Sequence, residues 1–183
     1  MSEINRHDWR KLETVPSSNS NISTALLDLS RAITKNQAHD AYWRIDNHVI
    51  VQGDLYQAAV AVVPCVLEIL QNCPKEARPF CLDLLAEIGF GTVDSLQQTI
   101  MDDCHREVSR GASIYFHILQ VGSDKKKEIA AILLIGVCLK YDPTLHDRVI
   151  WHLEKLKAET LNIGLRDTLL QELTDLKNKS VID

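Results

Sequence analysis

Residues 41–56, AYWRIDNHVIVQGDLY, hold the densest group of side chains in this sequence that could do chemistry. Asp46 and His48 lie two residues apart, and a carboxylate that orients an imidazole is a common arrangement for general acid–base catalysis. One such pair often arises by chance, however. The sequence has no Gly-x-Ser-x-Gly elbow, no phosphate-binding glycine loop and no His-Glu-x-x-His helix. We therefore predict that the protein is not an enzyme and uses no cofactor.

The same segment has the composition of a binding surface, because aromatic residues are enriched at interaction hot spots. Four apolar residues share odd-numbered positions, which would place them on one face of an extended segment: Trp43, Ile45, Val49 and Val51. The pattern predicts a non-helical island over 41–53, with a turn at 46–48. Such an island could cap the end of a helical core, or it could present a loop to a partner. In the second case the contacting residues would be Tyr42, Trp43, Asp46, Asn47, His48 and Tyr56.

Metal chemistry is not predicted. The sequence has an odd number of cysteines, mostly within apolar helical patterns: Cys65, Cys73, Cys81, Cys104 and Cys138. Cys65 and Cys73 are surrounded by core residues, and the acidic run 102–107, DDCHRE, lacks the paired spacing of a zinc site. His146 and His152 would lie on opposed faces of a helix. We predict no metal site and no disulfide framework, which favours a reducing cytoplasm.

Acidic residues suggest a second surface. The net charge is −5, so nucleic acid is not an expected partner, whereas a basic protein surface is. Glu76, Asp83 and Glu87 would share one face of a helix, and Asp175 occupies the position that matches Glu87 in a later repeat. Another acidic cluster comprises Asp94, Asp102, Asp103 and Glu107. Such residues can also simply solvate the outer face of a helix.

Helices must position these residues. Glycine (7) and proline (5) are scarce, and apolar residues recur at helical spacing. We expect helices over about 22–36, 55–72, 75–91, 95–121 (one or two, since Gly111 falls midway), 125–141, 144–158 and 161–176. The expected helix starts are Asn21 or Ser23, Asp54, Pro74, Ser123 or Asp124, and Asp142, while Pro64 should kink or split its helix. Residues 1–20 should form a flexible polar tail before a single domain over 21–183, and no secretory signal or membrane span is expected.

An internal pattern organises these helices. Arg78, Lys127 and Arg166 are spaced by 49 and 39 residues. Matching residues follow each cation at +3, +7 and +10: Cys81, Ala130 and Leu169; Leu85, Leu134 and Leu173; Ile88, Val137 and Leu176. One helix cannot bury such a stripe alone, whereas stacked helix pairs can. The alternative is an irregular helical bundle.

The pattern of a cation, a small residue, leucine and an apolar residue resembles the second helix of HEAT-type repeats. The segment 42–70, YWRIDNHVIVQGDLYQAAVAVVPCVLEIL, resembles small bacterial HEAT-like proteins. The repeat-like part of the resemblance covers about 54–176. It implies an all-α, right-handed superhelix of about three helix pairs that serves as a scaffold for binding other macromolecules.

Three functions follow as hypotheses. The first is a protein-binding module, specifically a cytoplasmic immunity protein that neutralises a cognate basic toxin. The second is an adaptor that joins two proteins. The third is an enzyme acting on DNA bases, because the resemblance extends to HEAT-like proteins of that kind. In that role Trp43, Asp46 and Trp151 would line the groove, but such a groove should be cationic. The oligomeric state is open.

Overall fold

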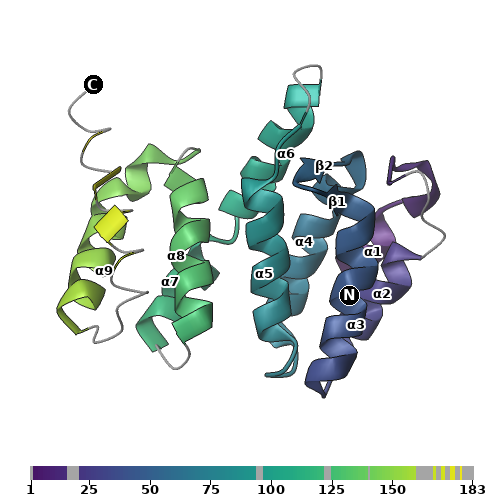
Figure 1. Cartoon of the computed structure of the whole chain (residues 1–183), viewed down its shortest axis with the longest axis horizontal. Helices are drawn as coiled ribbons and strands as arrows, with labels where there is room; N and C mark the ends of the chain where they lie inside the picture. Colours follow the sequence, from purple (N-terminus) through teal and green to yellow (C-terminus); the bar gives the residue numbers. More distant parts are fainter. Residues whose placement is uncertain are drawn as a thin grey trace.

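The computed structural model describes residues 2–15, 21–93, 97–121, 125–139 and 141–159, and a few single positions beyond 160. These residues form an all-α fold in which helices lie side by side in a row (Figure 1). The helices, with η marking 3-10 helices, are α1 Ser2–Arg6, η1 Trp9–Lys11, α2 Ile22–Arg31, α3 Lys35–Val49, α4 Gln57–Asn72, α5 Arg78–Phe90, α6 Gln98–Ser109, α7 Ala112–Val121, α8 Lys125–Leu139, η3 Pro143–Leu145 and α9 His146–Glu159. None of the helices in these ranges combines the length and hydropathy that a bilayer span requires.

Neighbouring helices form pairs, and the pairs stack. α2 packs on α3, α4 on α5, and α7 on α8. Between pairs, α4 contacts α2 and α6, while α5 contacts α3 and α8. The expected all-α class is therefore confirmed, and the arrangement is compatible with a helical repeat fold. The handedness of the superhelix stays a prediction.

The repeat positions of the first two units face the core. Cys81, Leu85 and Ile88 of α5 are buried, and so are their counterparts on α8, Ala130, Leu134 and Val137. α5 and α8 also contact each other directly. The third unit (169, 173 and 176) falls outside the described residues, as do the expected caps at 123 and 124.

The expected non-helical island over 41–53 is wrong, because residues up to Val49 belong to α3. Thr34 caps this helix through a reciprocal capping box with Gln37. The helix buries a stripe of Ala38, Ala41, Ile45 and Val49, with the spacing of one helix face. The expected turn at 46–48 is thus helical as well.

A short hairpin follows α3. β1 (Ile50–Val51) pairs antiparallel with β2 (Asp54–Leu55). Its turn places Gln52 and Gly53 at positive φ, 53° and 92°, as a two-residue hairpin turn requires. Asp54 therefore lies in a strand and does not cap α4, which begins at Gln57.

Several other boundaries differ from expectation. α2 begins after Asn21, which caps it as expected, but it ends at Arg31, and Ile33 is 71% exposed. Pro64 lies within one continuous α4. Pro74 begins a turn, and α5 starts four residues later. Residues 98–121 form two helices that separate at Gly111, the alternative that the sequence left open.

Residues 2–15 of the expected N-terminal tail lie against α4, and the expected flexibility of residues 1–20 stays a prediction. The backbone N–H groups of Ser2 and Glu3 donate to the Glu68 carboxylate of α4, at 2.9 and 3.1 Å. Ile4 is buried, and the Trp9 indole donates to its carbonyl at 2.9 Å. This N-terminal segment therefore packs against α4.

Candidate functional site

The strongest candidate site is the outer surface where α3 lies beside α5, which we call the α3–α5 face. Its residues recur at helical spacing on each helix, so each helix presents one stripe. They are His39, Tyr42, Trp43 and Asp46 on α3, and Phe80, Asp83 and Glu87 on α5. The two helices contact each other along this surface.

Four aromatic rings form the first half of this face. His39 contacts Trp43 and Phe80, with ring centroids 6.1 and 5.9 Å apart. Tyr42 contacts Trp43 and Phe80 at 5.2 and 5.9 Å. The Trp43 indole N–H also donates to Nε2 of His39 at 2.9 Å. Trp43 nevertheless stays 45% exposed, so a large ring is held in place while much of its surface remains open to a partner.

Carboxylates form the second half, in which Asp83 and Glu87 are exposed and Asp46 is buried beneath them, at 7% exposure. The Tyr42 hydroxyl donates a hydrogen bond to the carboxylate of Asp46, one helical turn away. Burial, and then the charges of Asp46, Glu87 and Asp83, raise the pKa of Tyr42. Burial and the charge of Glu87 also raise the pKa of Asp46. Acidic side chains of both helices therefore raise the pKa of the same residue, Tyr42. They make this half of the α3–α5 face electronegative.

An exposed aromatic ring beside several carboxylates suits a cation with an apolar stem. The ring face attracts ammonium or guanidinium groups, and the carboxylates accept their hydrogen bonds. Arginine and lysine side chains have both parts. The α3–α5 face is therefore chemically suited to a basic protein surface.

The structure joins two sets of residues that the sequence suggested separately. Tyr42, Trp43 and Asp46 came from the supposed island, whereas Asp83 and Glu87 came from the acidic stripe. All five lie on the α3–α5 face. His39 and Phe80 were missed, although His39 precedes Trp43 by one helical turn and could have been found had the segment been taken as helical.

The other candidate residues lie elsewhere. Asn47 is exposed on α3, but His48 is buried, and burial lowers its pKa. Tyr56 is half-buried, and its backbone N–H donates to Val49 at 3.0 Å. Glu76 is exposed in the turn before α5 and is not part of a helical stripe. Asp175 is exposed and accepts from Gln171 at 3.0 Å.

The catalytic arrangements weighed from sequence are not assembled. Asp46 and His48 lie two residues apart on α3, where side chains do not face each other, and Asp46 already accepts from Tyr42. Trp151 lies on α9, at the opposite end of the row from α3, which carries Trp43 (Figure 1). Within the described residues, no three His, Cys, Asp or Glu side chains gather where they could hold a metal ion.

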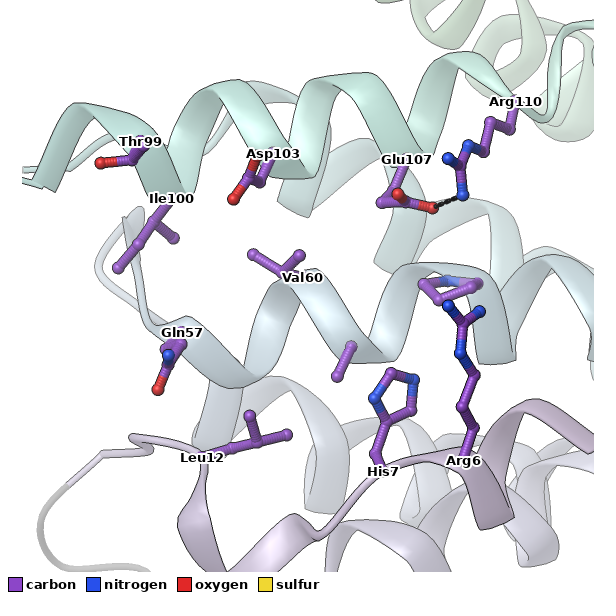
Figure 2. A pocket seen from close by; sticks show the side chains of 12 residues that line it. Arg6, His7, Leu12, Gln57, Val60, Thr99, Ile100, Asp103, Glu107 and Arg110 are labelled. Atoms are coloured by element: carbon purple, nitrogen blue, oxygen red, sulfur yellow. Dashed lines mark hydrogen bonds and ion pairs between the residues drawn. The ribbon is translucent and has the colours of Figure 1, made fainter.

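A cleft lies on another surface, between the N-terminal segment, α4 and α6 (Figure 2). Its volume is about 440 Å³, and its apolar floor includes Val60, Ala61 and Pro64. Asp103 and Glu107 of the other predicted acidic cluster line its wall, whereas position 94 falls outside the described residues. Figure 2 shows them on α6, across α4 from His7 and Arg6.

The charges around this cleft are largely neutralised within their own helices. Glu107 pairs with Arg110 at 2.7 Å, and Asp103 pairs with Arg106. Arg6 pairs with Glu3 at 3.3 Å. The cleft has the size of a ligand site, but it lacks the net charge and the ordered aromatic ring of the α3–α5 face.

Replacing Asp46 with asparagine should stabilise the protein at neutral pH. The folded-state pKa of Asp46 is raised, so above that pKa the folded protein bears the cost of a buried carboxylate. As the pH falls through this value, the folded state takes up the proton first and gains stability. Asparagine still accepts from Tyr42 but carries no charge. Urea unfolding should therefore show a higher midpoint for Asp46→Asn at pH 7, and the difference should shrink below the unfolded pKa of about 3.9.

Asp147→Asn on α9 is the control, since that side chain is fully exposed. It should change the midpoint little at either pH. A difference for Asp46→Asn that does not vary with pH would contradict the assigned cost of ionisation.

Comparison with protein-family models, with curated proteins and with solved structures finds no match to this chain.

Proposed function

We propose that this chain is a HEAT-like protein-binding module and that its α3–α5 face binds a basic protein surface. The observation that carries the proposal is the contact between an ordered, exposed aromatic cluster and a cluster of carboxylates. Trp43 is held by ring contacts with His39 and Tyr42 and by its hydrogen bond to His39, so little side-chain freedom is lost when a partner covers it. Large, fixed aromatic rings are typical anchors of protein interfaces.

Electrostatics support the same choice of partner. Asp46, Asp83 and Glu87 gather beside the aromatic cluster, and the whole chain carries a net charge of −5. A basic partner would be drawn to this face before contact, which raises the association rate. A nucleic acid would be repelled by it.

Within this class, the more specific proposal is a cytoplasmic immunity protein that neutralises a cognate toxin. Small size, acidity and a broad helical surface suit an inhibitor that covers a basic active site. An adaptor protein would need the same complementary surface. The two differ in their effect on the partner, because an immunity protein abolishes the activity of its partner and an adaptor leaves that activity intact.

The test is binding to the product of the adjacent gene, measured by calorimetry with the purified full-length chain. Trp43→Ala should weaken binding about tenfold or more, which corresponds to about 1.4 kcal/mol. Trp151→Ala is the matched control, because Trp151 is also exposed (58%) but lies on α9. It should leave the affinity within about twofold. Equal losses in the two variants would place the interface elsewhere.

Charge reversal tests the electrostatic part. The double variant Asp83→Lys, Glu87→Lys should slow association and remove most of its dependence on salt. The double variant Asp147→Lys, Glu154→Lys on α9 changes the net charge equally and should have a much smaller effect. If both slow association equally, only the net charge matters and the α3–α5 face is not the binding site.

A further inference from the structure

The cleft between the N-terminal segment, α4 and α6 has a continuous apolar surface. Val60, Ala61 and Pro64 of α4 form its floor. Leu12 and Ile100 extend this surface onto the two walls. Figure 2 shows Leu12 on the N-terminal segment and Ile100 on α6, with Val60 of α4 between them. A cleft of about 440 Å³ with such a lining has the size and the apolar character of a site for a small organic molecule.

α4 also lacks one helical hydrogen bond on the face that lines this cleft. Pro64 lies inside the helix, and proline has no backbone N–H, so it cannot donate to the carbonyl of Val60, four residues earlier. Residues four apart lie on the same face of a helix, and both Val60 and Pro64 line the cleft. The apolar floor therefore includes a backbone carbonyl without its helical donor. Such an acceptor favours a ligand that donates a hydrogen bond.

A second polar atom is unpaired beside the same cleft. Nε2 of His7 is buried and has no hydrogen-bond partner among the described residues, although His7 lines the cleft. The His7 ring is held at the edge of the Trp9 ring, with centroids 5.4 Å apart. The Trp9 indole is itself fixed by its hydrogen bond to the Ile4 carbonyl. A hydroxyl group can donate and accept, so it can pair with this nitrogen in either tautomer of the imidazole.

The charges that line the cleft do not favour an ion. Arg6 and Arg110 are balanced there by Asp103 and Glu107. Glu107 and Arg110 are paired with each other at 2.7 Å, and Arg6 is paired with Glu3 at 3.3 Å. Asp103 has an ion-pair partner on its own helix as well. A charged ligand would have to break these pairs or lose its water without gaining a partner, whereas an uncharged ligand leaves them intact.

We infer that this cleft is a binding site for a small uncharged molecule with an apolar body and a hydroxyl group. The body packs on the floor formed by Val60, Ala61 and Pro64. The hydroxyl group donates to the Val60 carbonyl in place of the N–H that Pro64 lacks, and His7 offers a second polar partner on the N-terminal wall. The cleft and the α3–α5 face lie on different surfaces, so this inference is independent of the proposed function and is tested without a protein partner.

The experiment titrates naphthol, its methyl ether and naphthoate into the full-length protein at neutral pH and follows the amide NMR spectrum. Naphthol should shift the amide signals of Val60, Ala61 and Ile100 and leave that of Trp151 on α9 unchanged. The methyl ether has no proton to donate and should bind about fivefold more weakly. Naphthoate should also bind more weakly than naphthol, because the cations in the cleft are already paired.

Pro64→Ala separates the hydrogen bond from the apolar contact. Alanine brings back the N–H that donates to the Val60 carbonyl, and it favours the helix, so this variant should fold. Both uncharged probes lose the same apolar surface, and their affinity ratio therefore reports on the carbonyl alone. The ratio should fall from about fivefold to about one. Pro143→Ala is the matched control, because Pro143 is exposed in η3 and does not line the cleft, and it should keep the parent ratio.

A larger side chain tests the location of the site. Val60 is half-buried, so the ring in Val60→Phe should extend into the cleft and abolish the binding of both uncharged probes. The inference is overturned if naphthol shifts none of the amides in the cleft, or if Val60→Phe binds naphthol as the parent does. It is also overturned if naphthoate binds more tightly than naphthol, or if Pro64→Ala keeps the parent ratio.

Discussion

Replacing Gly111 with alanine should lower the free energy of unfolding by about 2 kcal/mol. A Cβ atom at this position would lie 2.4 Å from the Tyr115 hydroxyl oxygen and 2.7 Å from a Leu67 methyl carbon. Tyr115 is fully buried, and its hydroxyl donates to the Val108 carbonyl at 3.0 Å, so its ring has little room to move. The usual gain of about 0.4–1 kcal/mol from Gly→Ala is smaller than this cost. Urea unfolding followed by circular dichroism measures the difference.

The control variant removes the Tyr115 hydroxyl group that a Cβ atom at position 111 would meet. In a Tyr115→Leu background the hydroxyl and the ring carbon that carries it are gone, and the Leu67 side chain can shift into the space. Alanine at position 111 should then be neutral or slightly stabilising. If the costs of Gly111→Ala and Tyr115→Leu simply add, the two residues do not interact, and close approach is not the reason for glycine here.

Gly111 also shows where sequence reasoning stops. Its low helix propensity predicted a weak point in residues 95–121, and the chain does divide there into α6 and α7. The folding of the Tyr115 ring back over this turn is a tertiary contact that no local pattern contains. The all-α class of the fold could be predicted from the spacing of apolar residues along the sequence. The reason for glycine at position 111 lies in tertiary packing and could not.

The error over 41–53 has a physical cause too. The buried stripe of α3 depends on Ala38 and Ala41, and alanine has too little apolar surface to stand out in a hydrophobic pattern. The apolar residues around Val49 alternate with a period of two, which predicts an extended backbone. An extended backbone is present only in the hairpin that follows α3. The capping box at Thr34 was present in the sequence and would have predicted a helix start.

The candidate site was predicted in pieces. Residue type alone identified Trp43 on one segment and Asp83 and Glu87 on another, but their meeting depends on α3 packing beside α5. Tyr42 shows this most directly, since its pKa responds to carboxylates on both helices. Whether this face binds a partner stays a prediction.

Replacing Leu134 with alanine should cost about 3 kcal/mol. Leu134 is 0% exposed in α8, at the repeat position that matches Leu85 in α5. The loss combines the apolar surface removed with the cavity left between helices that cannot fully collapse. Chemical denaturation should show a large fall in midpoint. A variant at Leu133, which is only half-buried on the same helix, should cost clearly less.

The packing of α8 on α5 can be tested in the same series with Gly89→Ala. A Cβ atom on Gly89 would lie 3.3 Å from a Val137 methyl carbon and 3.9 Å from a Leu134 methyl carbon. In the parent protein, the gain in helix propensity of about 1 kcal/mol is therefore offset by crowding. In the Leu134→Ala protein, Val137 can shift into the cavity and the new methyl has room, so Gly89→Ala should recover more stability than it does in the parent. A coupling of about 0.5 kcal/mol or more would show that the two repeat helices share one packed contact, whereas strict additivity would mean that α5 and α8 do not pack as described.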